Sequence, residues 1–515
     1  MTATLSQRLN RYGVTLRPQR GGSRNHANLV QFGNHLPDLP DYEASGRIKN
    51  AIPVGKSAYD QHKSLTAISG ALDARCQGAT TGKQQETGHT FHYAGDAAKL
   101  YGLVGTTWND YSKSGGYGLA SDEIWKFAQY GDTILAANID EDVQGLDFGS
   151  VTFANHFTST LTPKTRNLAV SKNFLFTGNN EEGGTRHPTR LRWSAVGDSK
   201  DMDSDADTQS DAQDIEGFGP IQHLVGRNYM TIFLKNGIVR ATYVGDPAVW
   251  RFDEVSITRG AYAPNCVASY GFTDFFLAED GFFLWDGVQA RPVGEGKVNR
   301  TFFEDLDTIY KSRIFCVADP QNSCFRVSYP SDNATSGEPD TQLIYNYVFD
   351  RWAFVSFDHE FAWEGRTKGI TLDDLDGYGT VDTLPFSLDS ERWTGGDAEL
   401  AAFDTSHRYG AFTGTAYTAE FDTPETELTP LQRSRVTRTR PIVDGGTVTT
   451  QVGHRRRLAD SNAFESAVAV NANGAHDHTD QDTTDRYHRL RVLVAAGFND
   501  AEGIEIESYP SGWIE

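Results

Sequence analysis

Two short segments of this 515-residue chain carry residue types that elsewhere bind phosphate or zinc. Gly55-Lys56-Ser57 matches the end of a P-loop, whose backbone holds phosphate oxygens, but Asn50 stands where that loop needs its first glycine. His359-Glu360 matches the start of a zinc-binding HExxH motif, but the second histidine is missing. The chain also has no GxSxG sequence, which a serine hydrolase would use. These segments therefore predict no nucleotide site, zinc site or serine nucleophile.

Two other segments bear on glycoside chemistry. Ser387-Leu388-Asp389 followed by Trp393 is a partial Asp-box, a turn motif of sialidases, without its glycine. Phe325-Arg326-Val327 is similar to a sialidase strand but lacks the proline that should follow. With 69 acidic residues, a carboxylate pair at glycosidase spacing stays an alternative, although abundance alone does not indicate a pair.

Three polar segments contain residue types that bind metal ions. Four aspartates alternate within Asp201–Asp207, so an extended segment would place them on one face, where they could hold Ca²⁺. Asp374–Asp382 resembles a shortened calcium loop without the spacing and terminal glutamate of an EF-hand. His476 and His478 are a candidate transition-metal pair. Solvated turns are the favoured interpretation of all three, so we expect no catalytic, cofactor-binding or metal-binding residue.

The C-terminal part contains the one concentration of basic residues. It comprises Arg433, Arg435, Arg438, Arg440 and Arg455–Arg457. Arginine forks pair with phosphates or carboxylates, so the cluster could contact DNA, an acidic partner or an identical neighbouring subunit. Strand-edge charge that prevents aggregation is the alternative.

The elements that would position these residues are β-strands joined by tight turns. Phe275–Gly287 reads FFLAEDGFFLWDG, in which two aromatic runs flank an Asp280-Gly281 step that suits a hairpin turn. Similar turn pairs recur roughly every 40 to 55 residues, the length of a propeller blade. They are Gly95-Asp96, Gly131-Asp132, Lys172-Asn173, Arg227-Asn228, Thr273-Asp274 and Gln321-Asn322. This spacing predicts an all-β chain with a β-propeller of about six blades; a large β-sandwich is the alternative.

Changes in amino-acid composition and in the pattern of predicted strands divide the chain into four parts. Residues 1–60 form an irregular N-terminal arm or contact segment, 61–365 the propeller, and 366–404 a connecting segment. Residues 405–515 form a C-terminal β-sandwich-like domain with two hairpins, one turning at Asp444-Gly445-Gly446 and one at Asn499–Gly503. Asp198–Asp214 is read as an acidic loop inserted between two units of the propeller.

Composition limits the classes of function. The net charge of −22 opposes a general affinity for nucleic acid or anionic membranes, although such a protein could surround DNA without holding it. Cys76, Cys266, Cys316 and Cys324 form no CxxC pair, so reduced thiols are expected. No apolar run approaches the length of a membrane span, and MTATLSQRLNRYGV has no apolar signal core. We expect synthesis and folding in a cytoplasm, without membrane insertion.

Segments spread over most of the chain, in order from residue 50 to the C-terminus, resemble one protein family. They are NAIPVGKSAY, LTAISGALDARCQGA, HTFHYAGDAAKLYGL, WNDYSKSGGYG, IWKFAQYGDTILAAN, LAVSKNFLFTGN, RLRWSAVGD and Thr371–Gly414. The family is that of tail nozzle, or tail hub, proteins of short-tailed bacteriophages and related head-to-tail virion proteins. The first 50 residues have no counterpart in this resemblance.

The resemblance implies a structural virion protein with a propeller, assembled in the host cytoplasm. Six copies would form a ring beneath a tail adaptor ring and continue the channel for double-stranded DNA. The ring would retain the genome, let it pass at ejection without specific binding, and anchor tail fibres or tailspikes. The alternative is a virion propeller that binds or degrades host-surface carbohydrate.

Overall fold

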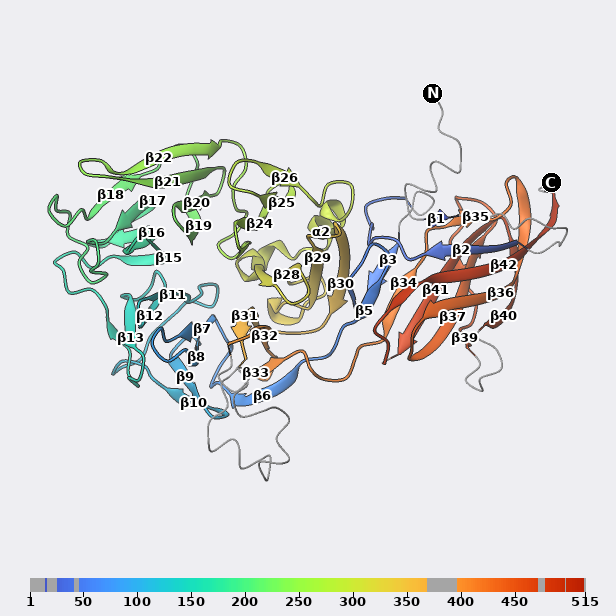
Figure 1. Ribbon diagram of the computed structural model, residues 1–515, viewed down its shortest axis with the longest axis horizontal. Coiled ribbons are helices and arrows are strands. Elements are labelled where there is room, and N and C mark those ends of the chain that lie inside the picture. Colours follow the sequence, from blue (N-terminus) through green and yellow to red (C-terminus); the bar gives the residue numbers. More distant parts are fainter. Residues whose placement is uncertain are drawn as a thin grey trace.

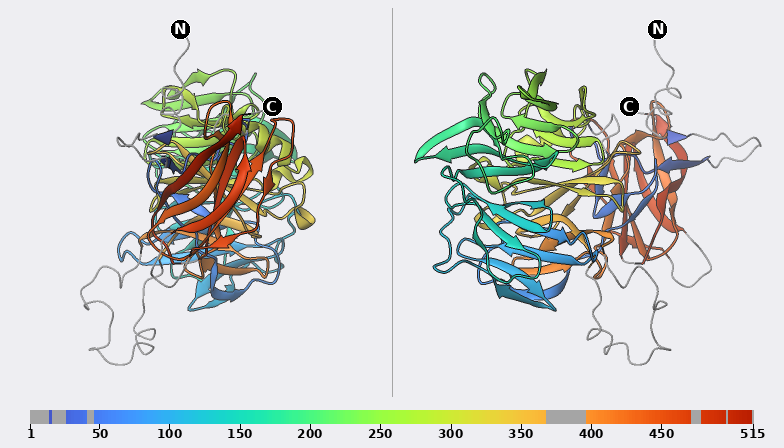
Figure 2. Two further views of the ribbon diagram at one scale, coloured as in Figure 1. Left: turned by 90° about the vertical axis from the view of Figure 1, so that its right-hand side faces the viewer. Right: turned by 60° about the vertical axis from the view of Figure 1, so that its left-hand side comes forward.

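The computed structural model describes residues 14–15, 26–40, 46–367, 396–470, 478–495 and 497–513. Strands make up 53% and helices 4% of the structure, which confirms the predicted all-β class. None of the helices in these ranges is long and apolar enough to cross a membrane. Figure 1 shows small sheets on one side and two larger sheets on the other, and Figure 2 shows the same division from two further directions.

Five antiparallel sheets of four strands follow one another along the chain. The first two contain β7 (Ala79–Lys83), β8 (Thr90–Gly95), β9 (Leu100–Val104) and β10 (Thr107–Asp110), then β11 (Lys126–Tyr130), β12 (Thr133–Ala137), β13 (Gln144–Asp147) and β14 (Ala154–Asn155). The third and fourth contain β15 (Lys164–Ser171), β16 (Phe174–Glu182), β17 (Thr185–Trp193) and β18 (Asp211–Asp214), then β19 (Ile221–Gly226), β20 (Met230–Leu234), β21 (Ile238–Gly245) and β22 (Val249–Ser256). The fifth contains β23 (Val267–Tyr270), β24 (Thr273–Ala278), β25 (Gly281–Trp285) and β26 (Ala290–Pro292).

Two more four-stranded sets complete this series. After α2 (Asn299–Asp305) and the 3₁₀ turn η2 (Thr308–Arg313) come β27 (Phe315–Asp319), β28 (Cys324–Tyr329), β29 (Thr341–Asn346) and β30 (Arg351–Ser356), with the 3₁₀ turn η3 (Thr335–Gly337) before β29. The last sheet contains β31 (Phe361–Arg366), β32 (Ala398–Phe403), β33 (Arg408–Ala411) and the distant β6 (Thr66–Ala71). The expected boundary at residue 405 therefore falls between two paired strands, β32 and β33.

The first strands of successive sheets lie against one another. β7, β11, β15 and β19 are in contact in turn, and β23 contacts β27, which contacts β31, which contacts β7. The sheets accordingly follow each other around a common centre in Figure 1. The sequence indicated six such units, and the described chain contains seven four-stranded sets. The last set was missed because one of its strands, β6 (Thr66–Ala71), lies far along the sequence from the other three, which begin at Phe361.

The predicted hairpin turns are partly right. Gly131-Asp132 and Lys172-Asn173 each join two paired strands, and Gly131, Lys172 and Asn173 have the positive φ that such turns need. Arg227-Asn228 and Gln321-Asn322 lie in the loops β19–β20 and β27–β28, and Gly95-Asp96 lies where β8 ends. The prediction for Thr273-Asp274 was wrong, because both residues lie inside β24 and the turn is Gly271-Phe272.

The aromatic hairpin β24–β25 turns one residue earlier than predicted. Ala278 pairs with Gly281, so Glu279-Asp280 forms the turn and Gly281 begins β25. Gly281 has φ +133°, and a Cβ there would lie 1.8 Å from Nδ2 of Asn299. The glycine therefore serves a close approach of α2 as well as the turn.

Two larger sheets form the C-terminal part. One contains β1 (Val14–Thr15), β2 (His26–Gln31), β42 (Ala501–Trp513), β36 (Gln432–Val443) and β40 (Thr479–Asp485), with β4 (Ala51–Pro53) and β5 (Tyr59–Gln61) attached. The other continues from β30 through β3 (Arg47–Lys49), β34 (Ala419–Asp422), β41 (Tyr487–Ala495), β37 (Thr447–Arg455) and β38 (Ala463–Phe464), with β35 (Thr426–Glu427) and β39 (Val468–Ala469) attached.

Both C-terminal hairpins predicted from the sequence were wrong. β36 and β37 lie in different sheets, and so do β41 and β42. Each strand alternates buried and exposed residues, and this pattern is the same whether the next strand pairs beside it or packs opposite it. Here the strands pack opposite each other, and Val436, Val452, Val492 and Ile504 meet in one core.

The N-terminal segment belongs to these sheets. β2 pairs with β42 over its full length, and β3 lies between β30 and β34. β3 thereby links the small sheets to the C-terminal part, and its Ile48 is fully buried. This segment had no periodic signal because its strands are short and their partners lie hundreds of residues away.

Candidate ligand-binding cavity

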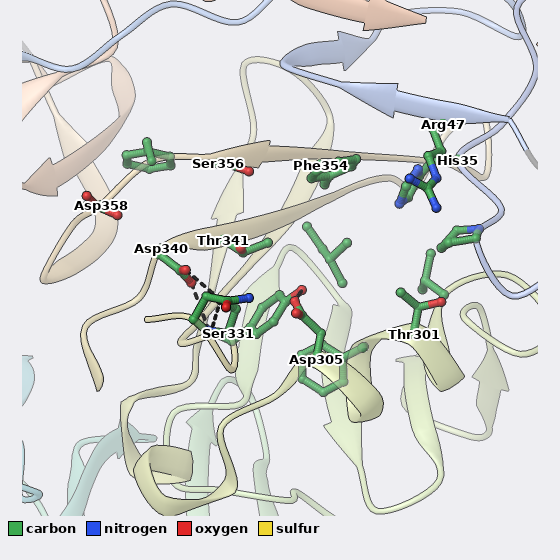
Figure 3. Close-up of a pocket in the computed structure, with 17 residues that line it drawn as sticks. His35, Arg47, Thr301, Asp305, Ser331, Asp340, Thr341, Phe354, Ser356 and Asp358 are labelled. Carbon is green, nitrogen blue, oxygen red and sulfur yellow. Dashed lines mark hydrogen bonds between the residues drawn. The ribbon is translucent and has the colours of Figure 1, made fainter. Parts of the chain in front are cut away.

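A large cavity lies where the N-terminal segment crosses the sheet of β27–β30. It has a volume of about 600 Å³ and is bounded by β29, β30, α2 and the loop from Tyr329 to Thr341. Figure 3 shows His35 and Arg47 at one end, Ser356 and Asp358 at the other, and Asp305 between them. Segments separated by 300 residues therefore form one polar space.

Asp38 fixes the helix that forms one wall. Its carboxylate accepts the backbone N–H groups of Arg300 and Thr301 at 2.9 and 2.8 Å, and also the hydroxyl of Thr301 at 2.8 Å. Val298, at the N-cap of α2, supplies no side-chain bond. The distant aspartate thus caps the helix, which orients Thr301 and Asp305 toward the cavity.

The carboxylates of the cavity differ in the number of hydrogen bonds that they already accept from the protein. Asp340 accepts both the backbone N–H and the hydroxyl of Ser331, at 2.9 and 2.7 Å. Asp305 accepts one bond, from the hydroxyl of Tyr329 at 3.0 Å, and burial raises its pKa. Asp358 is exposed to solvent. Asp305 and Asp358 therefore keep capacity to accept hydrogen bonds from a ligand.

The other end of the cavity offers hydrogen-bond donors. Nδ1 of His35 accepts a hydrogen bond from the backbone N–H of Ile48 at 3.4 Å. Burial lowers the pKa of this histidine to about 3, so its ring is neutral. Because Nδ1 is an acceptor, the proton of the neutral ring is on Nε2, which can donate into the cavity. Its ring packs on Phe354 at 4.8 Å between centroids. Arg47 is exposed and makes no ion pair within the part of the chain that the structure describes.

Aromatic rings complete the lining. Phe302, Tyr329, Phe354 and Phe357 all border the cavity. Apolar rings combined with a few carboxylate, hydroxyl and guanidinium groups are typical of sites for small polar ligands. The arrangement can bind such a ligand.

The residues singled out in the sequence mostly serve the fold. Gly55-Lys56-Ser57 lies in the turn between β4 and β5, where no helix follows within the described residues. His359 is buried, with Nε2 at 2.8 Å from the hydroxyl of Ser328, and burial lowers its pKa to about 4. Arg326 is buried and pairs with Asp319 at 2.6 Å, so it is a core ion pair.

The aspartates of 201–207 cap local turns. Asp203 accepts the backbone N–H groups of Thr160 and Leu161 at 2.9 and 2.8 Å, while Asp201 and Asp205 accept from residues two positions later. Across the described ranges no group of three or more His, Cys, Asp or Glu side chains could hold a metal ion. Asp374–Asp382, Ser387–Trp393 and His476 lie outside those ranges, and His478 lies 3.9 Å from Asp480.

Carboxylates of neighbouring strands neutralise much of the arginine cluster. Arg435 pairs with Asp482 at 2.7 Å, Arg438 with Asp480 at 3.1 Å and Arg440 with Glu505 at 3.4 Å. Arg455 pairs with the buried carboxylate of Glu425. Such pairing favours strand-edge charge within one chain over a contact to DNA.

Sequence reasoning did not find Arg47, Asp305 or Asp358. Each stands alone in the sequence, and only the fold brings them together.

Comparison with known proteins adds no relative: no family model and no curated protein matches the chain.

Proposed function

We propose that the chain is a structural subunit of the tail nozzle of a short-tailed bacteriophage. The observation that carries the proposal is the ordered set of segments, from residue 50 to the C-terminus, that resemble nozzle proteins. We further propose that the seven four-stranded sets form a β-propeller and that the two larger sheets form a β-sandwich. A propeller hides most strand edges, which suits a part exposed to the pressure of packaged DNA.

The centre of the seven sheets supports a channel between subunits rather than through one chain. Nζ of Lys126, on β11, lies 3.2 Å from Nδ1 of His223, on β19, and 3.3 Å from the carbonyl oxygen of Pro264. β15 lies between β11 and β19, so this contact reaches across the centre. Burial lowers the pKa of Lys126 to about 7, which indicates that little water surrounds the amine. A ring of copies would then enclose the channel.

The charge of the chain agrees with a passage for DNA. A net charge of −22 per copy would repel phosphates and lower friction during ejection. Partners in this proposal are further copies, a tail adaptor ring and tail fibres or tailspikes. A closed ring requires heterologous contacts between neighbouring copies, related by a rotation that brings the last copy back to the first.

Electron microscopy of the purified protein tests the proposal. Closed rings with a central channel are the expected particles. Single monomers at every concentration would contradict it.

A second candidate function, binding of a host-surface glycan, is favoured by the cavity of Figure 3. Phe354 and Phe357 could stack on sugar rings while Arg47, Asp305 and Asp358 bond to hydroxyl groups. The measurement is titration of the protein with oligosaccharides cut from the host surface. Asp305→Asn combined with Arg47→Gln is expected to weaken binding about tenfold or more, since two charge-assisted bonds are lost.

The matched control replaces an aspartate and an arginine away from the cavity, Asp211→Asn with Arg251→Gln, both exposed on outer strands. Equal affinities of the two double variants would contradict glycan binding in this cavity.

A further inference from the structure

Two adjoining cavities open at one end of the centre of the seven sheets. The larger has a volume of about 250 Å³ and the smaller of about 10 Å³, and both are lined by Asp122, Glu123, Ile124 and Ser312. Their walls come from the segments that lead into β7, β11, β23 and β27. Since these first strands surround the centre, the cavities form one opening on its axis.

The lining of this opening is basic although the chain is acidic. Five basic side chains, Arg75, Arg166, Lys235, Lys311 and Arg313, face three carboxylates, Asp122, Glu123 and Glu360. Two of these carboxylates already pair with another side chain: Glu123 pairs with Arg166, and Glu360 pairs with His407. Lys235 pairs with Glu279 at 3.4 Å.

Three cations of the opening are left without a carboxylate. Arg75, Lys311 and Arg313 form no ion pair with any residue of the described ranges. The lining holds five basic side chains against three carboxylates, and Glu279 outside it pairs with Lys235, so an excess of +1 remains. In a chain of net charge −22 this local excess is unusual.

The two arginines are held in place and have donors to spare. Arg75 donates to the carbonyl oxygen of Ser121 at 2.7 Å, and Arg313 donates to that of Ser336 at 2.7 Å and stacks on Tyr310. Nε of Arg313 is buried without a hydrogen-bond partner. A guanidinium has five N–H donors, so most of those on Arg75 and Arg313 remain available.

The guanidiniums of Arg75 and Arg313 line the same cavity and repel each other. Burial, and then repulsion by Arg313, lowers the pKa of Arg75, while the carboxylates of Glu360 and Glu338 partly oppose this shift. A bound anion would relieve both the repulsion and the unpaired donor. The planar fork of arginine pairs with two oxygens of a phosphate, as it does with those of a carboxylate.

We infer that this opening, the anion pocket of Arg75, Lys311, Ser312 and Arg313, binds the phosphate group of a small molecule. The smaller lobe has room for about one water-sized group, so the phosphate sits at the junction of the lobes, beside Ser312. The larger lobe takes the remainder of a phosphate ester. The inference does not depend on the nozzle proposal.

Calorimetric titration of the full-length protein with inorganic phosphate and with adenosine 5′-monophosphate tests the pocket. We expect saturable binding of one equivalent, weakened about tenfold or more by Arg75→Gln with Arg313→Gln. Tighter binding of the monophosphate assigns the pocket to a phosphate ester, and equal binding assigns it to free phosphate.

The control with the same loss of charge is Arg251→Gln with Arg456→Gln, two exposed arginines outside the opening, and its affinity should stay that of the parent. Lys311→Gln provides a test that does not depend on the buried arginines, because Lys311 is exposed, and it should weaken binding about two- to fivefold. Absence of saturable phosphate binding, or unchanged affinity in Lys311→Gln, would overturn the inference whether or not the double variant folds.

Discussion

Single buried polar residues tie distant segments of this chain together. Glu360 precedes β31, yet its carboxylate accepts the backbone N–H of Cys76 at 2.8 Å and lies 2.5 Å from Nδ1 of His407. Cys76 leads into β7 and His407 ends the turn between β32 and β33. One side chain therefore joins the first and last of the seven sheets.

Replacing this carboxylate is expected to destabilise the protein. Glu360→Ala leaves the N–H of Cys76 buried without an acceptor, which should lower the free energy of unfolding by about 1–3 kcal/mol. Glu360→Gln keeps an acceptor and should cost less. Urea unfolding of both variants measures the effect, and Glu254→Ala, on the exposed side of β22, is the control. A loss in Glu360→Ala no larger than in the control would contradict this role.

The same residue predicts a pH dependence. Burial raises the pKa of Glu360, so the folded state binds a proton more readily than the unfolded state. Its contribution to stability is therefore full below the ordinary carboxyl pKa and declines as the pH rises through the raised value. Glu360→Gln does not titrate, so its stability relative to the parent should increase from pH 4.5 to pH 7. A constant difference would show that the carboxyl is not perturbed.

Among the elements, the last of the seven four-stranded sets depends on pairing between distant parts of the chain. β6 supplies the fourth strand of the last sheet, with Gly410 opposite Ala67. A Cβ on Gly410 would lie 2.4 Å from the backbone oxygen of Thr66. The absence of a side chain there permits the two strands to approach.

Gly410→Ala is accordingly expected to lower the free energy of unfolding by about 1–3 kcal/mol through overpacking against backbone. The control is Gly118→Ala, where a Cβ would meet no atom within 4 Å. Chemical denaturation compares the two. Equal stability of both variants would mean that closure tolerates a wider spacing.

The sequence predicted single elements better than their partners. Turns such as Lys172-Asn173 were found because their backbone conformation restricts the residue types that fit. The partners of β36 and β37 were wrong, because alternation marks one buried face and not which strand covers it. The cavity residues Arg47 and Asp305 could not be found, since no local pattern connects positions that only the fold unites.

At the scale of the whole molecule, two acidic parts are joined through β3, which pairs with both β30 and β34. The shared core extends from Ile344 and Val355 of the small sheets to Val492 and Ile504 of the C-terminal part. Such continuity favours one stiff body, as the proposed ring subunit would require. In the ring that we propose, the contact of Lys126 with His223 and Pro264 would leave the space between copies as the route for DNA.

Averaged top views from electron microscopy of the purified assembly will show whether copies of this chain surround a channel, as we propose. We expect a closed ring in which the channel lies between subunits and the centre of each set of seven sheets is filled. A particle of one copy, or a channel passing through the centre of the seven sheets, would contradict it.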